Sequence, residues 1–145
     1  MADQQDPISP DEYVLRRISK DKNRYDPSLP QPIQRLSFEA SPLDKNGVSP
    51  DINGISVFRE IFVSAEAVAK AGGGARGYCV VRLRASDVTA LGLTIIPDPR
   101  DDQLPGHALI PELGFLQMKQ DKLKCKELQR HLVKLACNSI VFETQ

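Results

Sequence analysis

The most regular pattern of hydrophobic and polar positions lies between residues 53 and 85. Apolar side chains fall on both alternating sets of positions from residue 55 to 63, which predicts a strand covered on both faces. Residues 65–71 are rich in alanine; Ser64 can cap their first amides, and the glycines that follow can end a helix. Residues 78–84 alternate apolar and arginine side chains, which is typical of a half-solvated strand. Together these elements predict a βαβ unit.

Three stretches of different character precede this unit. Residues 1–8 are polar and have no core pattern, so we expect a flexible tail. Residues 13–18 predict a strand that follows a single helical turn. Residues 19–53 contain five prolines, which exclude long regular elements, but apolar residues are spaced along the segment. We therefore expect an extended, proline-rich connection that is pinned to the body of the protein.

The chain after the unit alternates short strands with one long helix. Residues 93–96, 107–110 and 140–142 are short apolar runs bounded by glycine, proline or asparagine, which predicts strands. Residues 119–137 place apolar side chains at helical spacing on an otherwise basic helix. The element order predicts a single α+β domain over residues 9–145, with a mixed β-sheet, one short crossover helix and a longer C-terminal helix.

Composition and charge exclude several functional classes. Of the 145 residues, 41% are hydrophobic and 26% are charged, as in an ordinary globular domain. Lysine plus arginine and aspartate plus glutamate both number 19, so no global field favours nucleic acid or an anionic membrane. We expect a cytoplasmic protein with no membrane segment, because no apolar run is long enough to span a bilayer. The three cysteines have no paired spacing and predict neither disulfides nor a metal site.

Two histidines are the natural candidates for acid–base chemistry. His131 lies among basic residues on the C-terminal helix and is expected to be solvated or to form a cap. His107 follows a proline and a glycine and begins an apolar strand, so its position is well fixed, whether it acts in catalysis or only bonds the neighbouring backbone. Metal, calcium and phosphate-loop motifs are all incomplete or in the wrong order, and no serine-hydrolase motif occurs.

Arginines on three predicted strands could converge on one sheet face and bind an anion: Arg16, Arg17, Arg59, Arg82 and Arg84. Arg59 matters most, because an unpaired charge inside so apolar a strand costs several kcal/mol. We expect an internal salt bridge there, with Glu60 or Glu112 as its partner, or else a bound phosphate.

The element order resembles that of the ADP-ribosyltransferase superfamily, in particular the NAD-consuming RNA phosphotransferases and the RES-type toxins. The resemblance is carried by an arginine-bearing strand at residues 13–18, a strand leading into an alanine-rich helix at 55–71, and a valine-rich strand followed by Ala85-Ser86-Asp87-Val88 and Leu91-Gly92. It implies an enzyme that uses NAD on a nucleic-acid or protein acceptor.

The residues implied by this resemblance should line one cleft. Arg16 or Arg17 would bind NAD, Ser56 or Arg59 would occupy the second-strand position, and His107 would orient a ribose hydroxyl or move a proton. The first-strand HG pair and the second-strand tyrosine of the family are missing, and Glu112 is the nearest stand-in for its catalytic glutamate. The runs at residues 54–59 and 105–108 also resemble small bacterial proteins, which suggests a bacterial origin and implies no activity.

The incomplete chemistry favours a second class of function. We expect a binding or regulatory module without cofactor or metal that acts through a protein partner, as in bacterial multi-gene systems of the defence or toxin–antitoxin type. The proline-rich segment and the basic C-terminal helix offer it surfaces. Residues 119–134 carry six basic and two acidic side chains, a local excess of four, but no aromatic residue that could stack on a base. Tight specific binding of nucleic acid is therefore not expected.

Overall fold

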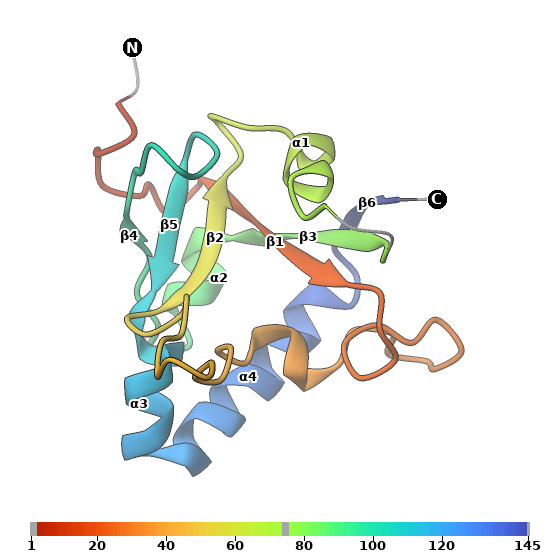
Figure 1. Cartoon of the computed structure of the whole chain (residues 1–145). Helices are drawn as coiled ribbons and strands as arrows, with labels where there is room; N and C mark the ends of the chain where they lie inside the picture. The colour runs from red at the N-terminus through yellow and green to blue at the C-terminus, as the bar shows by residue number, and fades with distance from the viewer. Residues whose placement is uncertain (1–2, 74–75, 145) are drawn as a thin grey trace.

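A six-stranded sheet with the order β4–β5–β2–β1–β3–β6 forms the centre of the fold (Figure 1). The computed structural model describes residues 3–73 and 76–144. The strands are β1 (Tyr13–Ser19), β2 (Ile55–Arg59), β3 (Tyr78–Arg84), β4 (Ile96–Pro97), β5 (His107–Ile110) and β6 (Ile140–Glu143). The helices are α1 (Ala65–Lys70), α2 (Ala85–Thr89), α3 (Phe115–Gln120) and α4 (Lys122–Ala136), with 3₁₀ turns η1 (Arg35–Phe38) and η2 (Pro111–Leu113).

The α+β class is confirmed, but the sheet differs from the mixed sheet that we expected. Every neighbouring pair of strands is antiparallel. β1 lies between β2 and β3 and is antiparallel to both, so β2 and β3 run in the same direction without bonding each other. The crossover through α1 therefore passes over β1.

Local signals placed most element starts correctly. The Ser64 hydroxyl accepts a hydrogen bond from the Ala67 amide at 3.1 Å and begins α1, as predicted. β2 ends at Arg59 and not at residue 63, because the Phe62 amide bonds the Arg59 carbonyl at 3.0 Å and closes a turn. Ile61, which we expected inside the strand, is 57% exposed.

The two faces of the sheet are covered by different elements. On one face, alternate residues such as Val14, Val57 and Val81 pack in one cluster with residues of α2 and α4. On the other face, Leu15, Phe58 and Val80 pack beneath Val68 and Ala69 of α1. Figure 1 shows α1 on the near side of the sheet, and α2 and α4 behind it. Side chains of adjacent strand residues therefore enter separate clusters.

Residues 19–53 contribute four buried residues to the larger cluster: Tyr25, Ile33, Phe38 and Ala40. The Tyr25 hydroxyl also donates to the Glu143 carboxylate at 2.6 Å, which ties this segment to β6. These contacts explain how a segment with so many prolines is held without long regular elements.

The C-terminal helix is interrupted where we expected one element over residues 119–137. Asp121 separates α3 from α4, and its carboxylate caps α4 by accepting from the Lys124 amide at 3.2 Å. β4 is also shorter than the predicted strand at residues 93–96. Each helix in the described ranges is too short or too polar to cross a bilayer.

Candidate functional site

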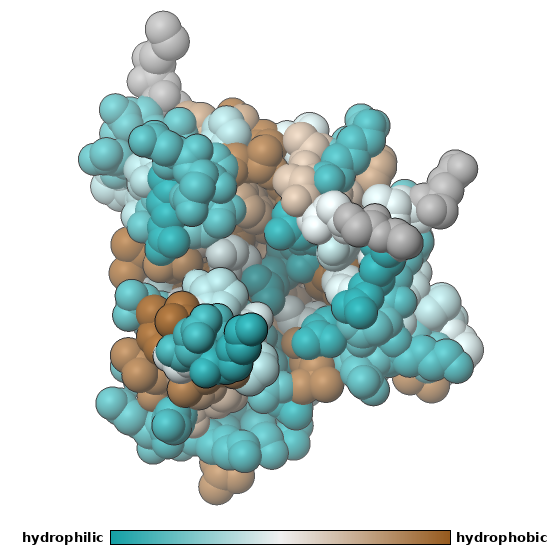
Figure 2. Space-filling view, in the orientation of Figure 1, coloured by the Kyte–Doolittle hydropathy of each residue, from teal (hydrophilic) through white to brown (hydrophobic). Residues whose placement is uncertain are grey.

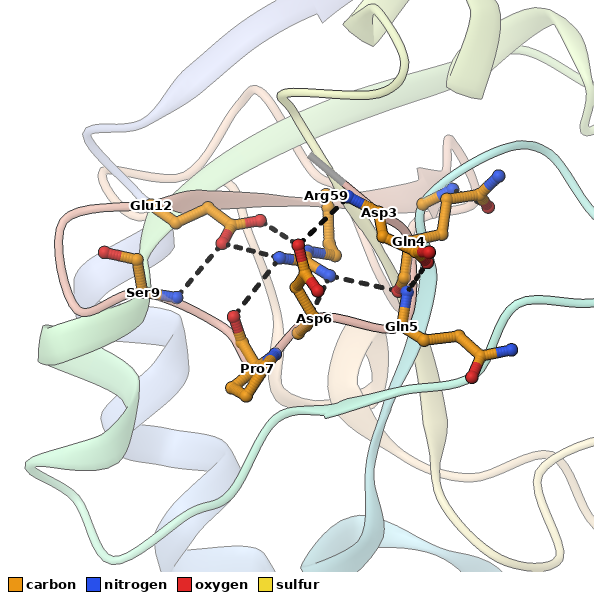
Figure 3. A network of polar contacts seen from close by, with 9 residues as sticks. Asp3, Gln4, Gln5, Asp6, Pro7, Ser9, Glu12 and Arg59 are labelled. Atoms are coloured by element: carbon orange, nitrogen blue, oxygen red, sulfur yellow. Dashed lines mark hydrogen bonds and ion pairs between the residues drawn. The ribbon is translucent and has the colours of Figure 1, made fainter. Parts of the chain in front are cut away.

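Arg59 ends β2 and has only 2% of its side chain exposed. Its Nε and Nη2 donate to the two carboxylate oxygens of Glu12 at 2.5 and 3.0 Å (Figure 3). The remaining N–H groups point to the backbone carbonyls of Gln4, Asp6 and Pro7, at 3.1, 2.8 and 3.4 Å. A guanidinium has five N–H donors, and this arrangement uses all of them. None remains for a phosphate.

The salt bridge that the sequence predicted is therefore present, but its partner is neither Glu60 nor Glu112. Glu60 pairs with Arg82 at 2.9 Å, and the Glu112 carboxylate accepts from the Thr94 amide at 2.8 Å. The partner, Glu12, lies 47 positions before Arg59. No pattern within β2 could have identified it.

The N-terminal segment, which we expected to be a flexible tail, makes specific contacts over residues 3–8. Besides its carbonyl bonds to Arg59, the Gln4 side chain accepts from the Gly106 amide at 2.9 Å, and Ile8 packs against the larger cluster. Residues 1 and 2 lie outside the described residues. The segment therefore covers the end of β2 and the start of β5.

Arg16 fills the gap where β1 and β2 diverge. The two strands pair only at Val14–Arg59 and Leu15–Phe58. Beyond that point Arg16 donates to the Ser56 carbonyl at 2.7 Å and twice to the Ser37 carbonyl, at 3.1 and 3.0 Å. Burial lowers the pKa of Arg16 to about 10, partly opposed by Asp51, so it stays cationic at neutral pH. Its role here is to satisfy backbone groups.

Arg17 projects to the opposite face. Its Nη1 donates to the Val68 carbonyl at 3.0 Å, and its guanidinium carbon lies 5.7 Å from the centre of the Tyr78 ring. Burial lowers the pKa of Arg17. The side chain lines a depression of about 450 Å³ that also includes Asp101 and Asp102. These carboxylates make the depression a poor site for the phosphates of a dinucleotide.

Ser56 and His107 meet directly. The His107 Nε2 lies 2.9 Å from the Ser56 Oγ, and the ring is 1% exposed. Its Nδ1 lies 2.8 Å from the backbone oxygen of Asp98 and 3.2 Å from a carboxylate oxygen of the same residue. Asp98 also binds Arg100, at 2.7 Å. Sequence reasoning identified the serine and the histidine separately but missed Asp98, whose only local signal is its place between two prolines.

The candidates predicted from the sequence do not share one cleft. Register pairs Arg59 with Val14 and its neighbour Phe58 with His107, so Arg59 and His107 project from opposite faces of the sheet. The alternation of β1 separates Arg16 from Arg17 in the same way. Among these five candidates, the described structure joins the side chains of Ser56 and His107 by a hydrogen bond, whereas Arg16 reaches only the backbone carbonyl of Ser56. The cleft required by the ADP-ribosyltransferase hypothesis is therefore not formed by these residues.

A separate groove of about 560 Å³ lies between the proline-rich segment and α4. Its described lining is Leu29, Pro30, Gln31, Ile33, Gln34, Arg35, Arg130, Val133 and Lys134, which includes four apolar residues, three cations and no carboxylate. We call it the α4 groove. Arg35 is held in place by a 2.6 Å bond to Gln129, which is buried in α4.

Large exposed apolar side chains elsewhere are dispersed over many elements: Leu43, Val48, Ile61, Ile96, Leu116, Leu123 and Val141, in addition to Leu29 in the groove. Figure 2 shows hydrophilic residues over most of the viewed face, with hydrophobic residues in separate patches. Dispersed apolar residues are normal on a protein surface. The groove combines an apolar lining with three cations, one of which, Arg35, also lies 3.9 Å from the Glu39 carboxylate.

The two buried thiols and the potential metal ligands offer no further site in the described parts of the chain. Burial raises the pKa of the Cys79 thiol to about 12 and also raises that of Cys125. Both thiols are therefore protonated at neutral pH and poor nucleophiles. No group of three or more histidine, cysteine, aspartate or glutamate side chains converges there in a way that could bind a metal ion.

Comparison of the chain with models of protein families, with curated proteins and with solved structures gave no match. The resemblance to ADP-ribosyltransferases, which was inferred from the order of elements, therefore stays a prediction that these comparisons do not test.

Proposed function

We propose that the protein is a binding module that recognises a partner protein through the α4 groove. The expected ligand is a segment with an apolar side chain flanked by carboxylates. The observation that carries this proposal is the lining of the groove, in which Leu29, Ile33 and Val133 are accompanied by three cations and, among the described residues, by no acid. Such a lining matches an acidic and apolar ligand in both polarity and charge.

The size of the groove suits one or two side chains of a partner. Its volume of about 560 Å³ falls within the usual range of small binding sites. Fully burying one leucine-sized side chain contributes roughly 1.5–3 kcal/mol. Charge-assisted hydrogen bonds from Arg130 and Lys134 would add to this and would fix the direction of the bound segment.

The groove walls are already ordered, which limits the entropy lost on binding. Ile33 is buried in the core and pairs with Tyr25 across a β-bridge, while the bond from Arg35 to Gln129 links η1 to α4. Pro30 fixes a backbone dihedral in the wall itself. A partner segment would therefore meet a surface close to its bound shape.

The experiment is a selection from a displayed library of random peptides, followed by fluorescence-polarisation titration of the enriched peptides. We expect enrichment of an apolar residue flanked by aspartate or glutamate. The variant Arg130→Glu with Lys134→Glu should weaken binding at least tenfold, which corresponds to about 1.4 kcal/mol. The matched control, Lys124→Glu with Lys126→Glu, makes the same charge change on the same helix away from the groove and should bind as wild type.

Two results would contradict the proposal. One is enrichment of peptides without acidic residues; the other is equal affinity of the selected peptides for the groove variant and its control. In the native host, the same pair of variants serves as a check on any co-purified protein. A true partner must be lost with the groove variant and retained with the control.

A further inference from the structure

We propose that Ser56 is an activated nucleophile that accepts an acyl group from small esters. The inference is independent of the α4 groove, since none of the groove residues takes part in it. It rests on the chain of contacts from the Ser56 Oγ to His107 and from His107 to Asp98. A serine, a base and a group that orients the base are the parts that activate a hydroxyl in unrelated folds.

The geometry fixes which nitrogen of His107 carries the proton. Nδ1 faces the backbone carbonyl of Asp98 at 2.8 Å and its carboxylate at 3.2 Å, and both are acceptors. In the neutral ring the proton must therefore lie on Nδ1. Nε2 is left as the acceptor for the Ser56 hydroxyl, at 2.9 Å. This is the tautomer that a general base needs.

His107 is also held rigidly in this orientation. The Asp98 amide donates to the His107 carbonyl at 2.9 Å, and the His107 ring bonds in return to the Asp98 carbonyl. These hydrogen bonds tie β5 to the loop that holds Asp98. The ring packs edge-on against Phe58, with centroids 5.4 Å apart. Prolines on both sides of Asp98 restrict the loop. A base fixed in this way loses little entropy when it acts.

The serine remains within reach of a small reagent. The apolar cluster beneath α1 includes Phe58 but not Ser56, which is only half-buried. The His107 ring is thus sealed from water, whereas Ser56 is partly exposed. A partly exposed serine on the sheet face can be reached by small, unhindered acyl donors.

The step balances without any cofactor. The Ser56 Oγ forms a bond to the ester carbonyl carbon as its proton passes to His107 Nε2. The tetrahedral species then breaks its bond to the leaving alcohol, which takes the proton back from the ring, and Ser56 is left esterified. At a partly exposed serine, we expect water to solvate the oxyanion in place of preorganised donors. Each such donor contributes about 10²–10³ in rate. We therefore expect single acylation events and slow turnover.

The test is incubation with p-nitrophenyl acetate and, in parallel, with a fluorophosphonate probe, followed by intact mass and peptide mapping. We expect one adduct, on Ser56, which Ser56→Ala abolishes. Because general-base assistance contributes typically 10²–10⁴, His107→Gln should slow labelling by at least about 100-fold. Asp98→Ala should cost less, since the backbone carbonyl still orients Nδ1.

Ser86→Ala is the matched control, because Ser86 is also half-buried and its hydrogen bonds within the described structure join it to Pro10, Thr89 and Ala90 and not to a histidine. It should leave labelling unchanged. Circular dichroism and thermal unfolding establish whether His107→Gln is folded. If it is not, Ser56→Ala decides alone, because it removes a single hydroxyl and its bond to His107 from a partly exposed residue. Labelling elsewhere in the chain, or an equal rate in a folded His107→Gln protein, would show that His107 is merely structural and would overturn the proposal.

Discussion

Replacing Glu12 with alanine should be among the most damaging single changes to this fold. Glu12 and Arg59 have only 4% and 2% of their side chains exposed, and the carboxylate takes two of the five guanidinium bonds. The alanine variant leaves a buried cation without its counter-charge. Breaking a buried ion pair from one side costs roughly 3–5 kcal/mol. That loss is a large part of the 5–15 kcal/mol that holds a typical domain together.

The magnitude is supported by a count of bonds. Hydrogen bonds to charged groups contribute about 1.5–3 kcal/mol each, and Glu12→Ala removes two of them. The carboxylate also accepts from the Ser9 amide at 3.1 Å, so the turn that precedes β1 loses a contact as well. The three carbonyls of the N-terminal segment still face Arg59 and offset part of the loss. A net cost near 3–5 kcal/mol follows.

Urea denaturation followed by circular dichroism measures this cost. With a slope near 2 kcal/mol per M, the midpoint of Glu12→Ala should fall by about 2 M, with the slope unchanged. The control is Asp11→Ala, which breaks the neighbouring pair to Arg84; Asp11 is 83% exposed, so the loss should stay below about 1 kcal/mol. Equal midpoints for the two variants would refute the assignment of Glu12 as an essential buried partner.

Three further predictions concern the core, two weakly acidic groups (the Cys79 thiol and the Tyr25 hydroxyl) and the basic helix α4. Val81→Asp places a carboxylate at a fully buried position, which costs several kcal/mol, and a soluble, cooperatively unfolding variant would contradict the core assignment. Burial raises the pKa of Cys79 from 9.0 to about 12, and a bond to Glu143 raises that of Tyr25 from 10.0 to about 12. The contribution of these two neutral groups to the free energy of unfolding is complete below about pH 9. It is lost toward pH 12, because the unfolded chain ionises at a lower pH than the folded protein. Urea midpoints that stay constant over that pH range would contradict these shifts. Finally, titration with RNA and DNA at physiological salt should show no submicromolar complex; one weakened by Lys124→Glu with Lys126→Glu would show that α4 binds nucleic acid.

The sequence by itself determined the elements whose signals are local. The cap at Ser64, the alternation along β3 and the apolar run that begins at His107 each depend on residues a few positions apart. Such patterns reflect bonds and burial within one element, so they survive without knowledge of its neighbours. They were sufficient for the α+β class and for the central place of β2.

Tertiary structure decided every contact between elements. Alternation within β2 established that Phe58 and Arg59 point in opposite directions, but only the register with β1 and β5 showed which face each one joins. The choice of Glu12 as partner for Arg59, and the meeting of Ser56, His107 and Asp98, depend on that register and on the strand order. Because a shift by one residue moves every side chain to the other face, register is a property of the assembled sheet and not of any one strand.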